Sequence, residues 1–433
     1  MRAMIALIQA NLAGKSPRFC MTPIAGKPLL QWQIESLARS GARFILVVCS
    51  KEASDIQDIL GDGSKFGLKI SYVLEERSSG TGGAMYYAAK TFKENFVFLE
   101  GDVLLDVDFD AFLKAHKKHD AIITALARPV PCPEASDMLV AREDGKILKI
   151  LPGGEKREEY YENLSYGGVY AVSKFFLETF ADMEEPIEMD FADDLFAPSV
   201  AVEGAYAYRS AEYVRRLDEG NQKELEAAVE KGVMLSRNRR SVKRAVFLDR
   251  DGVLNVFGNF VTKPEMLNLK DDAADALKKI NASTYLAVCI TNQPVVARGE
   301  TTIETLTEIH YRLQDLLGAG GAYLDGLYYC PHHPDKGFPG EVPELKIDCD
   351  CRKPKIGLLL RAKKDFNIDL ASSWFVGDTH QDVQTGINAG CRTILITSGD
   401  PNPSAKYKEA EPDYICENLA EAVDIILSQE KKN

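Results

Sequence analysis

The fold of this chain follows from one stretch, Ala245-Val246-Phe247-Leu248-Asp249-Arg250-Asp251-Gly252-Val253-Leu254-Asn255. Its apolar, β-forming beginning ends abruptly in two acids and a glycine, which predicts a buried strand that opens into a loop at its carboxyl end. Open α/β sheets bind their ligands at that edge. Asp249 and Asp251 would project toward one ligand there, and two close like charges are costly unless a cation or a shared proton relieves them. A magnesium ion would relieve them.

Length and composition narrow the class of protein. With 433 residues the chain is expected to form about two or three domains, and its hydrophobic share of 45% is typical of a soluble globular protein. A net charge of -13 argues against nucleic acid and anionic membranes as partners, since both need a basic face, but it allows a small anionic substrate. No apolar run approaches the roughly 20 residues of a membrane span, and the first residues lead straight into a strand. We therefore expect a cytoplasmic protein.

Strands and helices alternate through the first half, in the βαβ rhythm of a parallel sheet. Strands are expected at Met4–Gln9, Arg43–Cys49, Leu68–Leu74 and Phe96–Glu100, and helices at Leu30–Ser40, Gly83–Thr91 and, with many charges, Glu212–Lys231. The basic, aperiodic segment 233–243 is interpreted as a linker, because a second α/β unit starts at Arg244. The sequence thus predicts two Rossmann-like three-layer α/β domains, residues 1–232 and 244–433.

The Asp-x-Asp-Gly run resembles the first motif of the haloacid-dehalogenase-like phosphatases. From residue 243 to about 401 the chain resembles one branch of them, the D-glycero-D-manno-heptose 1,7-bisphosphate phosphatases. The resemblance implies that Asp249 attacks phosphorus and forms an aspartyl-phosphate. Asp251 would protonate the leaving sugar oxygen and then take a proton from water, a double role that favours a raised pKa. The run Gly377-Asp378-Thr379-His380-Gln381-Asp382 matches the fourth motif. Magnesium is accordingly expected on the carboxylates of Asp249 and Asp378 and the backbone carbonyl of Asp251, with Asp382 as a supporting acid.

Two further motifs supply groups for the phosphate. The apolar run that begins at Ala287 ends in Thr291-Asn292-Gln293, and the second motif implies that these residues bind the phosphoryl oxygens. The continuation Pro294-Val295-Val296-Ala297-Arg298-Gly299 resembles the heptose branch's Ser-Gly-Ile-Ala-Arg-Gly, with Pro294 and Val295 in place of the small pair. Arg298 stays available to a distal phosphate. By the third motif, Lys353 would neutralise the aspartyl-phosphate and Arg352 would contact the substrate.

Nine cysteines, an odd number spread through a long chain, argue against a disulfide framework. Three of them cluster beside a histidine, in a Cys-x-His pair and a Cys-x-Cys pair joined by a longer loop. This spacing suits tetrahedral zinc. The four expected ligands, which match the zinc loop of the heptose branch, are Cys330, His332, Cys349 and Cys351, with His333 as a further candidate. A closed four-ligand site is structural, and it would fix the loop that presents Arg352 and Lys353.

The first half resembles the sugar-phosphate nucleotidyltransferases in three features. Ile24-Ala25-Gly26-Lys27-Pro28-Leu29-Leu30 resembles the family's entry to its first long helix, and Gly80-Thr81-Gly82-Gly83-Ala84 is a glycine-rich loop running into a helix. Such a loop lets bare backbone approach a base or a phosphate. The third feature is Asp102, which follows a strand where the family has its magnesium-binding carboxylate. The resemblance makes Lys27, Gly80, Thr81, Gly82 and Asp102 the residues of a vestigial nucleotidyltransferase-like site.

Three departures set this half apart from the family. Ala10-Asn11-Leu12-Ala13-Gly14-Lys15-Ser16-Pro17-Arg18 replaces the family's Gly-Gly-x-Gly-Thr-Arg loop, which holds the nucleoside triphosphate. The lysine expected shortly before Gly26 is missing. In the run Tyr213-Val214-Arg215-Arg216-Leu217-Asp218 an arginine replaces the second metal carboxylate. Because two carboxylates on magnesium position the triphosphate, we expect that nucleotidyl transfer is lost or changed.

The preferred hypothesis is a magnesium-dependent phosphatase with a structural zinc ion. Its expected substrate is a phosphorylated sugar, most specifically the 7-phosphate of a heptose 1,7-bisphosphate. In the first alternative, both halves are active and the first half transfers a nucleotidyl group to heptose 1-phosphate. The second alternative is a protein that binds a sugar phosphate or nucleotide without catalysis, and a histidinol phosphate substrate also stays open.

Overall fold

The structure is a computed structural model that describes residues 4–218, 220–258, 260–399 and 407–430. The outer ends of both expected domains and the end of the phosphatase resemblance near residue 401 lie outside these residues. The chain divides into two compact units, and the main boundary between them, after Arg239, falls inside the predicted linker. Unit 1 comprises residues up to 128, 137–152 and 164–239. Unit 2 comprises residues from 240 onward together with 129–136 and 153–163.

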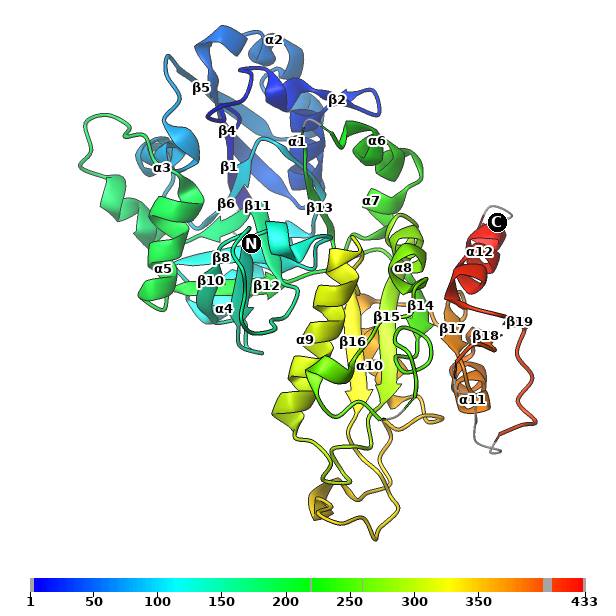
Figure 1. Cartoon of the computed structure of the whole chain (residues 1–433). Helices are drawn as coiled ribbons and strands as arrows, with labels where there is room; N and C mark the ends of the chain where they lie inside the picture. The colour runs from blue at the N-terminus through cyan, green and yellow to red at the C-terminus, as the bar shows by residue number, and fades with distance from the viewer. Residues whose placement is uncertain (1–3, 219, 259, 400–406, 431–433) are drawn as a thin grey trace. The chain divides into compact units, whose positions relative to one another are not determined.

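Unit 1 is built on a nine-stranded mixed sheet (Figure 1). Its strands are β1 (Met4–Gln9), β4 (Ala42–Ser50), β5 (Lys69–Glu75), β6 (Phe96–Glu100), β8 (Ile123–Arg128), β9 (Met138–Ala141), β10 (Ile147–Leu151), β11 (Ser165–Val172) and β12 (Ala205–Arg209). The order is β10-β9-β11-β6-β1-β4-β5, with β8 between β11 and β12. The predicted parallel sheet is present over β6, β1, β4 and β5, whereas β11 runs antiparallel to β6.

The remaining elements of unit 1 pack on or beside this sheet. They are β2 (Pro23–Ile24), β3 (Lys27–Pro28), β7 (Val103–Asp106), β13 (Tyr213–Arg216), α1 (Leu29–Arg39), α2 (Ile56–Leu60), α3 (Gly80–Thr91), α4 (Phe109–His119), α5 (Ala197–Ala201), α6 (Gln222–Glu230), α7 (Val233–Ser236) and a π-helical turn, Phe191–Phe196. Successive residues of β1 alternate between two cores, as strand geometry requires. Ile8 packs with α1 and α4 on one face, and Leu7 packs with α3 on the other. The unit therefore has three layers.

One predicted helix of unit 1 is wrong in its first part. The segment expected as a helix over Glu212–Lys231 begins as strand β13, which pairs antiparallel with β7, and becomes helical only at Gln222. Tertiary pairing overrides the local helical pattern of a charged segment. The segment predicted as a linker contains helix α7, whose Val233 and Met234 belong to a core cluster of unit 1.

Unit 2 is built on a six-stranded sheet of order β16-β15-β14-β17-β18-β19, in which every neighbouring pair is parallel. Its elements are β14 (Arg244–Leu248), α8 (Ala273–Asn281), β15 (Tyr285–Asn292), α9 (Ile303–Ala319), β16 (Gly326–Cys330), α10 (Gly357–Phe366), β17 (Trp374–Gly377), α11 (His380–Ala389), β18 (Arg392–Ile396), β19 (Tyr414–Cys416) and α12 (Leu419–Glu430). Val246 and Leu248 pack with α8, α9 and α12. Helices α10 and α11 contact the strands as well, so this unit is also a layered α/β domain.

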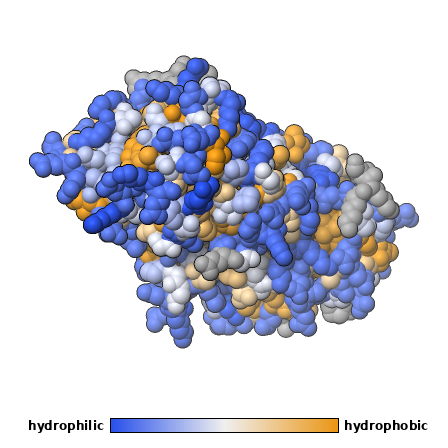
Figure 2. Space-filling view, turned by 90° about the horizontal axis from the view of Figure 1, so that it is seen from above, coloured by the Kyte–Doolittle hydropathy of each residue, from blue (hydrophilic) through white to orange (hydrophobic). Residues whose placement is uncertain are grey.

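The predicted fold class, two three-layer α/β domains, is confirmed. In unit 2 the central strand β14 lies between β15 and β17, and this order decides which strand ends can meet. Among the residues that the structure describes, no helix has both the length and the apolar composition needed to cross a bilayer. The face shown in Figure 2 is mostly hydrophilic, with apolar residues in scattered groups.

Candidate active site

The carboxyl ends of three neighbouring strands of unit 2 bring the predicted phosphatase residues together. Asp249 follows β14, Thr291 and Asn292 end β15, and Asp378 follows β17. Because these strands are parallel, their carboxyl ends share one edge of the sheet. A single cleft at this edge is lined by Asp249, Asp251, Phe257, Phe260, Thr291, Asn292, Pro294, Arg298, Arg352, Lys353, Asp378, Thr379, Gln381 and Asp382. Of the predicted catalytic, magnesium-binding and substrate-binding residues of this unit, Gln293 alone does not line it.

The buried ammonium of Lys353 links two carboxylates in this cleft. Its Nζ lies 2.8 Å from Oδ2 of Asp249 and 2.6 Å from Oδ1 of Asp382, and its side chain is 3% exposed. Burial raises the pKa of Asp249 to about 7, with the charge of Asp382 adding to the effect and Lys353 opposing it. The pKa of Lys353 is raised, because the two carboxylates outweigh its burial. Lys353 therefore stays protonated and holds Asp249 in a fixed place.

Three carboxylates in the cleft fit a magnesium ion. Oxygens of Asp249, Asp378 and Asp382 lie within 4.8 Å of one another, and magnesium prefers carboxylate oxygens. Asp382 is also committed elsewhere, since it accepts hydrogen bonds from Lys353 and from the Thr379 hydroxyl at 2.6 Å. These contacts are compatible with the role of supporting acid, which stays a prediction for Asp382. The side chain of Asp251 is not part of this group, so Asp251 could join it only through its backbone carbonyl, as predicted.

Gly252 is required for Asp378 to approach the first loop. Its φ is +82°, in the left-handed region that side chains rarely adopt. A Cβ built at this position would lie 1.9 Å from Oδ2 of Asp378. The glycine of the Asp-x-Asp-Gly run thus allows the carboxylate after β17 to lie against the loop after β14.

Asp251 is held by three side chains. Fully buried Arg250 donates to its two oxygens at 2.8 and 2.9 Å, Gln293 donates to Oδ2 at 2.8 Å, and Asn255 donates to Oδ1 at 3.1 Å. Burial alone would raise the pKa of Asp251, but the charge of Arg250 and these hydrogen bonds lower it. The raised pKa predicted for Asp251 is therefore wrong, and the cause is the arginine between the two acids.

Gln293 and Asn292 hold other site residues. Gln293 is buried and donates to Asp251 and, at 2.9 Å, to Oγ1 of Thr291. The Asn292 side-chain oxygen accepts from the backbone N–H of Lys353 at 3.0 Å. Its amide nitrogen donates to the Lys353 carbonyl at 3.3 Å. Asn292 therefore anchors the third motif to the second, and Gln293 orients Asp251 from behind the cleft.

Two arginines add positive charge to the cleft. The Arg298 guanidinium lies over the rings of Phe260 and Phe338, 4.8 and 4.7 Å from their centroids. Such stacking fixes a guanidinium while leaving its edge free to donate. Arg352 donates from NH1 to the carbonyl of His332 at 3.2 Å, which ties it to the Cys-x-His pair. The cleft that contains Asp249 thus also has two fixed cations for an anionic group.

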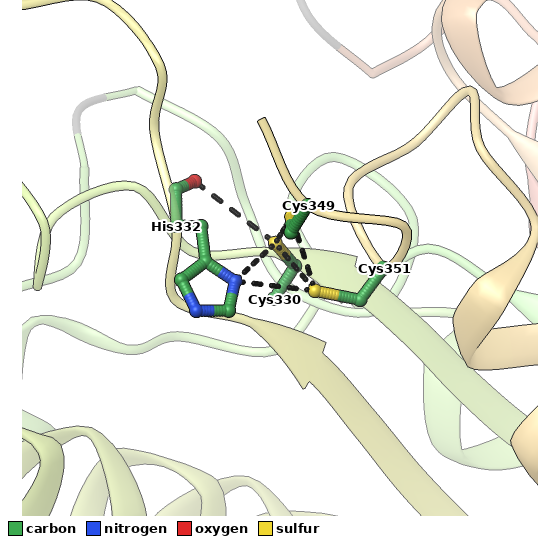
Figure 3. A group of neighbouring side chains, drawn as sticks. All are labelled: Cys330, His332, Cys349 and Cys351. Carbon is green, nitrogen blue, oxygen red and sulfur yellow. Dashed lines mark hydrogen bonds between the residues drawn. The ribbon is translucent and has the colours of Figure 1, made fainter. Parts of the chain in front are cut away.

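The four predicted zinc ligands point toward one another (Figure 3). The Cys351 sulfur lies 3.2 Å from the sulfurs of Cys330 and Cys349 and 3.2 Å from Nδ1 of His332. Tetrahedral zinc with Zn–S bonds of about 2.3 Å separates its ligand atoms by about 3.8 Å, so the group fits with small shifts. Hydrogen bonds from Cys330, Cys349 and His332 lower the pKa of Cys351 to about 5, despite its burial. His333 is outside the group and contacts Arg298, with 3.3 Å between Nε2 and NH2.

In unit 1 the residues of the predicted vestigial site each contact a different part of the chain. Lys27 pairs with Glu35 at 2.9 Å and lies over the Trp32 ring. The glycine-rich run is itself the first turn of α3, and the backbone N–H of Gly82 donates to the Met189 carbonyl at 2.9 Å.

The other three residues of that set, Gly80, Thr81 and Asp102, also contact other parts of the chain. Thr81 donates from its hydroxyl to Asp190 at 3.0 Å. A Cβ at Gly80 would lie 2.2 Å from the Met189 carbonyl oxygen. The room that the glycines leave is therefore taken by the chain's own segment around Met189, and Asp102 is paired with Arg216.

Comparisons with known proteins agree with the two-unit architecture. The nucleotidyl transferase family model matches residues 18–234, and the HAD-hydrolase-like family model matches residues 350–422. The D-glycero-beta-D-manno-heptose-1,7-bisphosphate 7-phosphatase of Pasteurella multocida (strain Pm70) is 38% identical over 187 residues, which cover 43% of this chain and 97% of that protein. The chain therefore belongs to two families, the nucleotidyl transferases and the HAD-like phosphatases.

Other matches are of the same kinds. The phosphatase of the same name from Escherichia coli (strain K12) is 38% identical over 193 residues, 43% of this chain and 95% of that protein. The crystal structure of D,D-heptose 1.7-bisphosphate phosphatase from B. bronchiseptica, complexed with magnesium and phosphate, has 29% identity and a TM-score of 0.37, and covers 43% of this chain and 99% of that one. HddC from Yersinia pseudotuberculosis, complexed with GMP-PN, has 21% identity and a TM-score of 0.43, and covers 53% and 99%.

Membership of the HAD-like phosphatases confirms the predicted enzyme class, a phosphoric monoester hydrolase, and the nucleotidyl transferase domain allows a second activity. Sequence reasoning missed several residues of the phosphatase cleft. Arg250 was identifiable only as the unspecified residue of Asp-x-Asp-Gly. Gln381, whose amide donates to the Lys353 carbonyl at 2.8 Å, occupies an unspecified position of the fourth motif. Phe257 and Phe260 lie in a loop without any motif.

Proposed function

We propose that unit 2 hydrolyses a phosphate monoester of a sugar, namely the 7-phosphate of D-glycero-D-manno-heptose 1,7-bisphosphate. The observation that carries this proposal is the placement of Asp249 in the cleft, paired with Lys353 and next to Asp378 and Asp382. A nucleophile, a fixed cation and a metal-binding acid group are the parts that phosphoryl transfer needs. The relatives named as heptose bisphosphate phosphatases support the choice of substrate.

The chemistry follows from the placed side chains. An Asp249 oxygen attacks phosphorus, the ester P–O bond breaks, and Asp251 gives its proton to the leaving sugar oxygen. Water then attacks the phosphorus of the aspartyl-phosphate and gives a proton to Asp251, which releases inorganic phosphate and restores Asp249. Magnesium, held by Asp249, Asp378 and the Asp251 carbonyl, would supply charge neutralisation at the phosphoryl group. Lys353, which is paired with Asp249, would also neutralise negative charge on the phosphoryl group.

The low pKa of Asp251 constrains its part in this scheme. In the structure the Asp251 carboxylate accepts hydrogen bonds from Arg250, Gln293 and Asn255, and the charge of Arg250 and these bonds lower its pKa despite its burial. A carboxyl that donates a proton must first leave such partners or meet a substrate that raises its pKa. Arg250 therefore sets how readily Asp251 gains its proton, and we assign to it the control of the acid step.

Arg298 and Arg352 support a substrate with two anionic groups. One phosphate would occupy the centre beside Asp249 and Lys353, and the second would meet the two guanidiniums in the same cleft. Histidinol phosphate has a single phosphate and a cationic amine, so it would leave these arginines without an anion. The structural zinc ion that we propose at Cys330, His332, Cys349 and Cys351 would fix the adjacent Arg352 and Lys353.

For unit 1 we propose that nucleotidyl transfer is lost or changed, as the sequence departures suggest. The alternative of two active halves predicts transfer from GTP or another nucleoside triphosphate to heptose 1-phosphate. Measuring that reaction with the whole chain separates the two. A nucleotide at this unit and a cytoplasmic location stay predictions.

One screen tests the phosphatase proposal. The whole chain with magnesium is assayed for phosphate release from heptose 1,7-bisphosphate, heptose 7-phosphate, hexose phosphates and histidinol phosphate, with Asp249→Asn as the control. The proposal expects the bisphosphate to have the largest kcat/KM and the control to be inactive. If histidinol phosphate had the largest kcat/KM, it would be the substrate in place of heptose 1,7-bisphosphate. Binding without turnover would favour the non-catalytic alternative.

A further inference from the structure

Arg216 contacts two acidic residues of unit 1, Glu100, which is the last residue of β6, and Asp102, which follows that strand. Arg216 is the last residue of β13, and the antiparallel pairing with β7 places it opposite Val103. In the same register the backbone N–H of Leu217 donates to the Asp102 carbonyl at 2.7 Å. Sequence positions more than a hundred residues apart are thereby fixed side by side by the backbone.

The guanidinium contacts both buried acids with one nitrogen. NH1 of Arg216 donates to Oε2 of Glu100 at 2.6 Å and to the two oxygens of Asp102 at 2.9 and 3.1 Å. The acid side chains are 7% and 3% exposed, whereas that of Arg216 is 46% exposed. Buried carboxylates need a partner of opposite charge, and here Arg216 is that partner.

The space for this guanidinium depends on Gly168, in β11. This residue has φ +68°, and a Cβ built on it would lie 2.8 Å from Val103, 3.1 Å from Glu100 and 3.2 Å from NH2 of Arg216. A side chain there would crowd Val103, Glu100 and the guanidinium together. The ion triad is therefore enclosed by backbone on the β11 side.

These residues do not fit the divalent cation that the nucleotidyltransferase resemblance implies. Magnesium needs oxygen ligands at about 2.0–2.1 Å in an octahedral arrangement. The oxygens that would supply it, those of Asp102 and Glu100, already contact a cation, and the position expected to bring the second carboxylate brings that cation. A metal ion could bind these oxygens only by displacing the guanidinium of Arg216 from them.

We propose that Arg216 is a resident cation that takes the place of the divalent metal in unit 1. Glu100 and Asp102 then bind no metal ion, and a phosphorylated ligand of this unit meets a guanidinium instead of a metal. This inference does not depend on phosphatase activity in unit 2. It gives the expected loss of nucleotidyl transfer a specific cause, a metal site filled by an arginine.

The test measures binding of Mn²⁺ by electron paramagnetic resonance of the whole chain. Asp249→Asn and Asp378→Asn are present throughout, so that the phosphatase cleft does not bind the probe. Into this background Arg216→Asp or Arg216→Ala is introduced. Arg215→Asp is the matched control, because Arg215 is the preceding residue of β13 and pairs with Glu224 instead, at 2.6 Å. Thermal unfolding of each variant checks that it folds.

The proposal expects no Mn²⁺ at unit 1 in the background or in the Arg215→Asp control. It expects about one additional ion per chain in Arg216→Asp. Adding Asp102→Asn to that variant should abolish the gain. If Arg216→Asp fails to fold, Arg216→Ala decides by the same criterion. The proposal is overturned if the background binds an ion that Asp102→Asn removes, or if folded Arg216 variants gain none.

Discussion

The Nζ of Lys353 lies 2.8 Å from the carboxylate of Asp249, and the two side chains are 3% and 13% exposed. Removing one partner of such a buried ion pair destabilises the fold, because the other charge stays buried and unpaired. Here the loss of Lys353 would leave both Asp249 and Asp382 without their cation.

Lys353→Met should therefore reduce both stability and phosphatase rate. We expect the free energy of unfolding of unit 2 to fall by about 3–5 kcal/mol at pH 7.5, because two buried carboxylates lose their partner. Chemical denaturation and phosphate release measure the two effects. The control is Lys355→Met, whose ammonium is half-exposed and pairs with exposed Asp348. A Lys353 variant as stable and active as this control would contradict the prediction.

The raised pKa of Asp249 predicts a pH-dependent stability in magnesium-free buffer. A carboxyl with a folded pKa of about 7, against 3.8 as its ordinary value, binds its proton more tightly in the folded state. Its contribution to stability is fully present below pH 3.8 and is lost as the pH rises through 7. Asp249→Asn carries no such charge and so keeps its stability as the pH rises. Between about pH 5 and pH 8 the free energy of unfolding of the variant should therefore exceed that of the wild type by an increasing amount, up to about 4 kcal/mol.

Thermal unfolding midpoints of both proteins across that pH range measure the difference. Saturating magnesium should shrink it, because the ion stabilises the charged form of Asp249 in the wild type only. A difference that is flat with pH would show that Asp249 has an ordinary pKa.

Replacement of a zinc ligand should lower both the zinc content of the protein and its rate of phosphate release. Cys351→Ser removes the thiolate that contacts Cys330, Cys349 and His332, so we expect the zinc content to fall from about one ion per chain toward none. Phosphate release should fall too, because Arg352 is tied to His332. The control is Cys132→Ser, an exposed cysteine outside the group. Metal analysis by mass spectrometry decides, and equal zinc in both variants would rule the site out.

Arg298 and Arg352 should determine the preference for a second phosphate. Replacing either by Met removes a charged hydrogen bond, for which we expect a loss in kcat/KM of about 10- to 100-fold with heptose 1,7-bisphosphate. With heptose 7-phosphate the loss should be only a few-fold, since the second anion is absent. Arg361→Met, on the exposed side of α10, serves as the matched control. Equal losses with both substrates would mean that the arginines serve the reacting phosphate.

The fold and the main site residues were predictable because each motif lies where an apolar strand ends. Asp249, Thr291 and Asp378 each follow or end a β-forming run, and parallel strands bring such ends to one edge. The group formed by the Cys-x-His and Cys-x-Cys pairs was predictable for a different reason, because short spacings leave few arrangements for their side chains.

What the sequence could not predict depends on contacts between distant segments. The low pKa of Asp251 comes from the orientation of Arg250, and an adjacent residue can point to either side of a loop. The charged segment that contains Tyr213–Arg216 has a helical sequence pattern, but it forms strand β13 because it pairs with β7. The guanidinium of Arg216 on Asp102 follows from that same pairing.

The aspartyl-phosphate is the central claim, and trapping it tests the account most directly. The whole chain is mixed with magnesium and heptose 1,7-bisphosphate labelled at the 7-phosphate, quenched in acid during turnover, and its peptides are mapped. The account predicts label on the peptide that contains Asp249, lost on a chase with unlabelled substrate and absent from Asp249→Asn. Phosphate release at an undiminished rate by Asp249→Asn, or label on another residue, would contradict it.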